Sequence, residues 1–162
     1  MTTPANLRAI RLRIGMSFEE AASLLGYDPK TYGPRERAKS INVFERDVTI
    51  LHAVEGHFNA YVDRMIEAGP RAVLVGYMNE NCFQFYEPGI AKSLVFNSVH
   101  RMALAMAQDS HAANGLDVPI VELVPELYAK WLESRRLSDS PLERQAWAVE
   151  RLKAFRTIPA PK

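Results

Sequence analysis

The sequence has few of the features that define several common classes of protein. It contains one cysteine, Cys82, among 162 residues, so no disulfide can form within the chain and a four-cysteine zinc site is excluded. Its apolar runs are only a few residues long, and none is expected to span a membrane. The first residues lack the basic start and apolar stretch of a signal peptide. We therefore expect a soluble, cytoplasmic protein.

The chain also lacks a strong charge of either sign. Lysine and arginine number 20, aspartate and glutamate number 19, and the formal net charge is +1. This balance argues against indiscriminate coating of nucleic acid, which requires a field of basic residues. The two signs are nevertheless uneven along the chain. Residues 1–50 have eight basic and six acidic side chains, whereas residues 51–162 have twelve and thirteen, so a local basic face remains compatible with the count.

The hydrophobic content of 48% is enough for a core that needs no disulfide or metal. Apolar residues at helical spacing dominate, and the predicted fold class is mainly α with a small β element. Residues 82–86 are ambiguous between a strand and a helical turn. The expected helices span residues 7–14, 18–25, a short segment from 29, 43–68, 92–112, 125–136 and 141–155, and the expected strands span residues 72–77 and 118–121.

Local signals define the ends of the early helices. Ser17 and Glu20 form the pattern of a capping box, in which each side chain bonds the backbone amide of the other. Gly26 is suited to a left-handed helix end, and Asp28-Pro29 is typical of a helix start. We expect Gly33-Pro34 to interrupt the third helix, because Pro34 lacks an amide donor.

This order of elements resembles the Cro/cI-type (xenobiotic-response-element) family of DNA-binding domains. The resemblance implies an N-terminal helix-turn-helix domain over residues 1–50. Residues 51–112, with Phe96-Asn97-Ser98-Val99, are similar to the dimerisation half of phage and plasmid autorepressors, including anti-CRISPR-associated repressors, and residues 113–162 form a C-terminal helical extension. The segments that match are Leu7-Arg8-Ala9-Ile10-Arg11, Gly15-Met16-Ser17, Glu20-Ala21-Ala22, Leu25-Gly26, Thr31-Tyr32 and Glu36.

The resemblance also implies which residues contact DNA. Lys30 lies where the family reads base edges, and an early end of the third helix at Pro34 would turn Arg35 outward. Phe18 stands where the family commonly has a glutamine that contacts phosphate. The predicted DNA-binding residues are Lys30, Thr31, Arg35, Arg37 and Lys39, with Arg11 and Arg13, beside Arg8, as backbone clamps.

No set of residues in the sequence has the spacing of an active site. His52 and Glu55 share a helix face, but His57 is turned away, so a metal site would need ligands from elsewhere. Ser98 and His100 are two apart on a helix and cannot form a nucleophile–base pair. Cys82, among aromatic residues, is expected to be buried and structural. We expect no catalytic residue, no metal site, no cofactor and no enzyme activity.

The predicted function is therefore a DNA-binding transcriptional regulator. We expect a homodimeric repressor of its own operon, bound to a palindromic double-stranded operator. The alternative is a protein-interaction module on a degenerate helix-turn-helix fold, such as an antitoxin or an inhibitor of a bacterial defence complex. Phe18, Gly33 and Pro34 favour this alternative, since they offer little to a DNA base.

Overall fold

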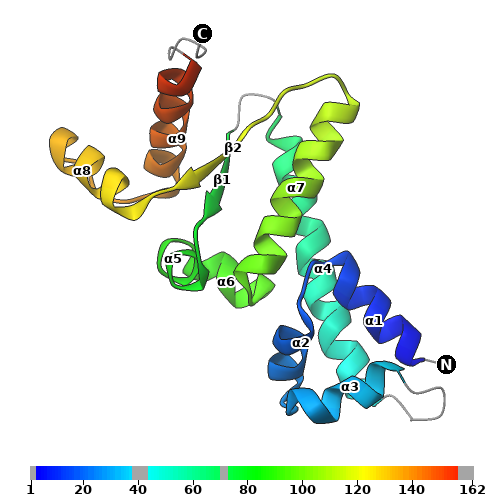
Figure 1. Ribbon diagram of the computed structural model, residues 1–162. Coiled ribbons are helices and arrows are strands. Elements are labelled where there is room, and N and C mark those ends of the chain that lie inside the picture. Colours follow the sequence, from blue (N-terminus) through cyan, green and yellow to red (C-terminus); the bar gives the residue numbers. More distant parts are fainter. Residues whose placement is uncertain (1–2, 38–43, 70–72, 157–162) are drawn as a thin grey trace, which may run out of the picture. The chain divides into compact units, whose positions relative to one another are not determined.

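The computed structural model describes residues 3–37, 44–69 and 73–156, and within them the chain is mainly α-helical with one two-stranded sheet (Figure 1). This confirms the predicted fold class. The elements, in chain order, are α1 (Pro4–Arg13), α2 (Phe18–Leu25), α3 (Pro29–Arg37), α4 (Glu45–Glu67), β1 (Leu74–Tyr77), α5 (Glu80–Tyr86), α6 (Pro88–Leu94), α7 (Asn97–Ala113), β2 (Ile120–Leu123), α8 (Pro125–Arg135) and α9 (Pro141–Arg156).

The chain divides into two compact units, each built from two separate stretches of sequence. Unit 1 comprises Met1–Tyr61 and Glu87–Ala103, and unit 2 comprises Val62–Tyr86 and Leu104–Lys162. The division falls within α4 and within α7, so each of these helices contributes to both units. The sequence favours three consecutive regions instead, because a helix shared between two units has the same apolar periodicity as a helix within one.

The core of unit 1 is formed by the apolar faces of its first helices. The expected stripe of α1 is present, since Leu7, Ile10 and Ile14 are all buried. Ala21 and Ala22 of α2 are fully buried as well. Helices α1 and α2 both pack against α3, as Figure 1 shows. The first three helices thus form a small bundle in which α2, a three-residue turn and α3 follow one another.

The expected interruption of the third helix is wrong. Helix α3 continues through Pro34 to Arg37. A proline ring crowds the amide and the Cβ atom of the residue before it, which normally excludes that residue from helical conformation. Gly33 has no Cβ atom, so much of this conflict disappears. Side chains also stabilise the end of α3, because Tyr32 and Glu36 are both buried.

The predicted helix at residues 92–112 is likewise wrong in one respect, because the structure divides it. Helix α6 ends at Leu94 and α7 starts at Asn97, with Val95 at a φ of 68° between them. A β-branched residue in this region is strained. Buried neighbours on both sides, Leu94 and Val99, fix the chain there. Because no glycine or proline marks position 95, local sequence signals could not reveal the break.

Helix α4 confirms the prediction of one long helix within residues 43–68. Its 23 residues correspond to a length of about 35 Å. Its apolar stripe is buried at Val48, Leu51, Phe58 and Val62, whereas Phe44, just before the helix, is 52% exposed.

Unit 2 contains the sheet. Strands β1 and β2 are parallel, and Leu74 pairs with Ile120 while Tyr77 pairs with Leu123. Helix α9 packs against both strands, and α5 packs against β1. All four residues of β1 are buried, but β2 alternates between exposed and buried positions. The ambiguous segment at residues 82–86 is helical, as part of α5.

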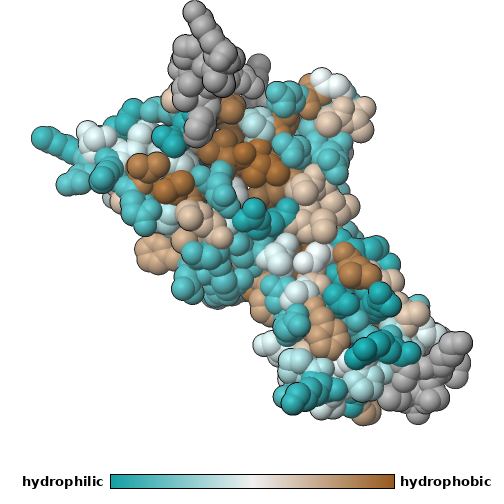
Figure 2. Space-filling model, in the orientation of Figure 1, coloured by the Kyte–Doolittle hydropathy of each residue, from teal (hydrophilic) through white to brown (hydrophobic). Residues whose placement is uncertain are grey.

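An aromatic cluster joins α8 and α9 to the rest of unit 2. Tyr128 is fully buried, with its ring in edge contact with Trp147 at 5.8 Å and with Tyr86 at 5.8 Å between centroids. Trp131 stacks on Tyr128 at 6.0 Å. Tyr128, Trp131 and Trp147 thus pack α8 and α9 together. In the view of Figure 2, hydrophobic surface gathers over the strands of this unit.

None of the helices within the described ranges has the length and apolar character needed to cross a bilayer.

Candidate nucleic-acid interface

Both ends of α2 and the start of α3 are defined by local contacts that the sequence predicts. The Glu20 amide donates to Ser17 Oγ at 3.1 Å, and the Ser17 amide donates to Glu20 Oε2 at 2.6 Å, which completes the capping box. Gly26 ends α2 with a φ of 75°, a conformation that other residues adopt only with strain. The Lys30 amide then donates to Asp28 Oδ1 at 2.8 Å and starts α3. These contacts fix the direction in which α3 leaves the turn.

A buried ion pair fixes α3 against α1. Arg11 donates from Nε to Glu36 Oε1 at 2.7 Å and from Nη2 to Glu36 Oε2 at 2.9 Å. Its third nitrogen, Nη1, donates to the carbonyl of Met16 at 3.0 Å, and the Tyr32 hydroxyl donates to Glu36 Oε1 at 2.7 Å. The side chains of Arg11 and Glu36 are only 10% and 4% exposed. Such a two-bonded pair constrains both the distance and the orientation of the helices.

The pKa values of this group follow from the same contacts. Burial by itself would raise the pKa of Glu36, but hydrogen bonds from Arg11 and Tyr32, together with the charges of Arg11 and Arg8, lower it overall. The bond to Glu36 raises the pKa of Arg11 despite its burial. Burial, and then the bond to Glu36, raises the pKa of Tyr32. The pair is therefore ionised at neutral pH and does not itself titrate there.

The outward face of α3 is cationic. Lys30, Thr31, Pro34 and Arg37 are all exposed. Positions 30, 34 and 37 recur at helical spacing, so their side chains share one face, with Thr31 beside them. Arg37 Nε also donates to the carbonyl of Gly33 at 3.3 Å, which keeps part of its side chain along the helix. Two of the predicted DNA-binding cations, Lys30 and Arg37, are thus brought together.

Arg35 lies on a different side of α3, between two aromatic rings. Its guanidinium carbon is 4.3 Å from the centroid of the Tyr27 ring and 4.6 Å from that of Phe44. The Tyr27 hydroxyl in turn donates to Asp47 Oδ2 at 3.0 Å. The expectation that Arg35 points outward because the helix ends early is therefore wrong. A guanidinium held between rings is partly buried but keeps edge N–H groups for other acceptors.

The remaining predicted contacts are distributed unevenly. Arg11 is engaged in the buried ion pair, so its guanidinium positions α3 and has little access to a phosphate. Arg13 is exposed and pairs with Glu55 at 2.6 Å, and Glu55 also bonds His52 at 3.0 Å. Lys39 lies outside the described residues.

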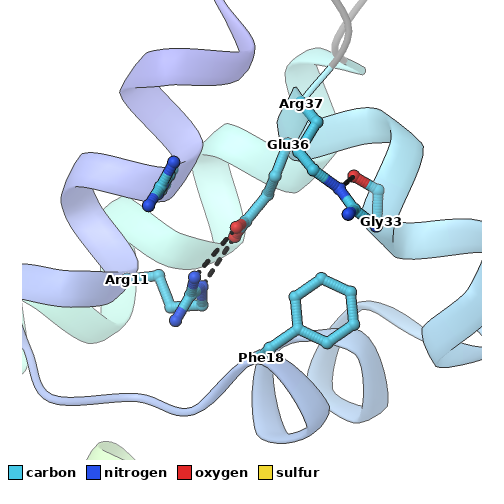
Figure 3. Close-up of a pocket in the computed structure, with 6 residues that line it drawn as sticks. Arg11, Phe18, Gly33, Glu36 and Arg37 are labelled. Carbon is cyan, nitrogen blue, oxygen red and sulfur yellow. Dashed lines mark hydrogen bonds and ion pairs between the residues drawn. The ribbon is translucent and has the colours of Figure 1, made fainter.

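A pocket opens between α1, α2 and α3 beside the ion pair (Figure 3). Its volume is about 330 Å³, and its lining is Arg8, Arg11, Phe18, Gly33, Glu36 and Arg37. Figure 3 shows the Phe18 ring below the Arg11–Glu36 pair, while the Arg37 side chain extends back toward Gly33. The Phe18 ring is itself packed on Tyr32, with 5.0 Å between ring centroids. This pocket and the aromatic sandwich around Arg35 were not found from the sequence, because both depend on residues brought together by tertiary packing.

The other candidate residues have structural contacts. The Ser98 hydroxyl donates to Glu20 Oε2 at 2.8 Å. His100 is fully buried, and its Nε2 lies 3.2 Å from the Tyr61 hydroxyl. Cys82 is half-buried, less than the sequence suggested. Within the described ranges, no three histidine, cysteine or acidic residues are placed to hold a metal ion.

No family model matches this sequence, and no curated protein is similar to it. The interpretation of the site therefore rests on its geometry.

Proposed function

We propose that the protein binds double-stranded DNA through α3 and acts as a transcriptional regulator. The observation that supports this proposal is the exposed cationic face of α3, which contains Lys30, Thr31 and Arg37, on a helix fixed by a turn and a buried ion pair. A helix of this kind fits the major groove of B-DNA. The rigid connection matters because base recognition needs side chains whose positions are set before contact.

The exposed cations of unit 1 suit contacts to phosphate as well as to bases. Arg37 and Lys30 can donate to guanine or to phosphate oxygens, and Thr31 can bond either a base or the backbone. Arg8 on α1 is also exposed. Its side chain forms no ion pair with any acidic residue in the described ranges. Arg8 is thus a candidate for the contact to the DNA backbone, in place of the buried Arg11.

We further propose that two copies of the chain bind a palindromic operator. One α3 helix reads only a few base pairs, so a second copy would supply the affinity and the symmetry of the site. Exposed apolar side chains in unit 2 support an association through that part of the chain, since Phe85 and Leu142 are each 74% exposed. Light scattering coupled to size exclusion measures this directly, and a mass of 18.3 kDa at micromolar concentration would contradict the dimer.

A protein-interaction module is the second candidate function. It is favoured by Pro34, which lies in the middle of the exposed face of α3 and has no side-chain group that can hydrogen-bond to a base. Glu19, exposed at the start of α2, would also repel a phosphate. Under this function the same cationic face would bind an acidic protein surface.

Selection from a random pool of duplexes tests the DNA proposal. The purified full chain is incubated with 30-base-pair random duplexes, the bound fraction is sequenced over successive rounds, and the enriched site is measured by fluorescence anisotropy. We expect an enriched inverted repeat with sub-micromolar affinity that falls steeply as salt is raised, because Lys and Arg contacts release counterions. No enriched sequence, with equal affinity for all duplexes, would favour the interaction module.

A further inference from the structure

The lining of the pocket between α1, α2 and α3 has more positive than negative charge. It is lined by three arginines and a single carboxylate. The charge of Glu36 is already matched by the two hydrogen bonds of Arg11. Neither Arg8 nor Arg37 forms an ion pair with an acidic side chain within the described residues. Two positive charges therefore remain available beside a cavity whose walls are held in place.

The opposite part of the lining is apolar and flat. Phe18 presents its ring to the pocket, and the Tyr32 ring behind it keeps that ring from turning away. Gly33 leaves the surface of α3 open, because a Cβ atom there would lie 2.7 Å from Arg37 Nη2 and 3.3 Å from Phe18 Cζ. The absence of a side chain at position 33 thus keeps both the cavity and the position of Arg37.

We infer that this pocket binds a small phosphate monoester with a flat organic group. Arg8 and Arg37 match a doubly charged phosphate, because a guanidinium donates two parallel hydrogen bonds to such oxygens. Phe18 provides a face on which a planar ring can pack. The volume of about 330 Å³ lies at the lower end of small-molecule sites. The inference is independent of DNA binding, although Arg37 belongs to both sites, so a bound ligand would compete with DNA for it.

Phenyl phosphate is the probe for this site, since it combines a phosphate with one aromatic ring. Its binding to the full chain is measured by calorimetry and by amide NMR shifts at 150 mM salt, beside inorganic phosphate and phenol. We expect phenyl phosphate to bind at least about tenfold more tightly than either fragment, with shifts at residues of α1 and α3. Equal binding of inorganic phosphate would overturn the inference, because the apolar wall would then be unused.

Two substitutions with matched controls locate the site. Arg8→Ala is expected to weaken phenyl phosphate at least about tenfold, whereas Arg46→Ala, which removes an exposed arginine of α4, should not change it. Gly33→Ala should abolish binding by displacing Arg37, whereas Gly56→Ala meets open space and should have no effect. Wild-type affinity in both Arg8→Ala and Gly33→Ala would overturn the inference. Arg8 is exposed, so its variant remains decisive if Gly33→Ala fails to fold.

Competition with DNA separates the two proposals. If DNA does not bind but phenyl phosphate does, only the proposed function fails. If a DNA duplex binds and phenyl phosphate does not, only the present inference fails. If phenyl phosphate binds and also releases a selected duplex, both stand. A last comparison uses one duplex with and without a 5′-phosphate. Equal displacement of phenyl phosphate by the two duplexes supports a free small-molecule ligand. Much stronger displacement by the duplex that has the 5′-phosphate overturns the assignment to a small molecule.

Discussion

Each of the two units has its own pattern of internal side-chain contacts. In unit 1, polar side-chain pairs join separate segments around the apolar core: Arg11 with Glu36, Tyr27 with Asp47, and Tyr61 with His100. In unit 2, aromatic rings around Tyr128 join α8 and α9, and a single carboxylate, Asp139, accepts hydrogen bonds from the Tyr128 hydroxyl and from Arg144 beside them. Apolar packing tolerates small shifts, whereas an ion pair with two hydrogen bonds defines one geometry. The Arg11–Glu36 pair holds the buried side of α3, the helix that we propose reads DNA, where precise orientation matters most.

The largest expected effect of a single substitution is in the aromatic cluster. Trp147 is 1% exposed, so Trp147→Ala removes a large buried side chain and leaves a cavity. We expect the free energy of unfolding to fall by about 4 kcal/mol, measured by urea denaturation that is followed by circular dichroism. Trp131→Ala is the matched control and should cost clearly less, because Trp131 is only half-buried. Equal losses would contradict the expectation that burial determines how much each tryptophan of the cluster stabilises the fold.

Removal of Glu36 tests the polar network of unit 1. Glu36→Ala leaves the buried guanidinium of Arg11 without its partner, and we expect a loss of about 3 kcal/mol. Replacement of both residues, Arg11→Met with Glu36→Leu, removes both buried charges and should cost less than Glu36→Ala alone. The measurement is again urea denaturation. A double variant as unstable as the single one would show that packing, and not the buried charge, determines the loss.

The acid side of the stability profile gives a third, smaller test. Burial, with a further effect from the charge of Arg101, lowers the pKa of His100 to about 4. Because the unfolded chain has the ordinary value near 6.5, the unfolded state takes up a proton first as the pH falls. The contribution of neutral, buried His100 to the free energy of unfolding is therefore fully present above about pH 6.5 and is lost as the pH falls from there to about 4. We expect a loss of about 2 kcal/mol from pH 8 to pH 5.

His100→Gln is the variant that isolates this effect. It replaces the ring by a neutral amide that does not titrate, so the difference in stability between pH 8 and pH 5 should become smaller than in the original chain. Glu36 and Glu55 add little to this difference, because their carboxyl pKa values are lowered and both groups stay mostly ionised between pH 8 and pH 5. An unchanged difference would show that His100 does not control the acid response.

The local features of the fold could be predicted from the sequence. The capping box at Ser17 and Glu20 depends on two residues three apart, and the left-handed end at Gly26 depends on one glycine. Signals of this range are contained in the sequence itself. The two wrong predictions of helix bounds concern Pro34 and Val95, where tertiary packing overrides a local preference.

Much of the candidate site could not be predicted in the same way. The cationic residues of α3 were identified, but their distribution around the helix was not. Arg11 was expected to face DNA because its charge is visible in the sequence, whereas its partner Glu36 is 25 positions away. Likewise, the contact between Arg35 on α3 and Phe44, just before α4, depends on tertiary packing.

The most direct test of the central claim compares two pairs of cations on DNA. Lys30→Ala with Arg37→Ala removes two charges from the exposed face of α3, and Lys130→Ala with Arg135→Ala removes the same charge from α8. Anisotropy with the selected duplex is measured over a range of salt concentrations. The α3 pair should weaken binding at least about tenfold and reduce the salt slope by about 2, whereas the α8 pair should leave both near their original values. An unchanged affinity and slope in the α3 pair would contradict the claim that this helix binds DNA.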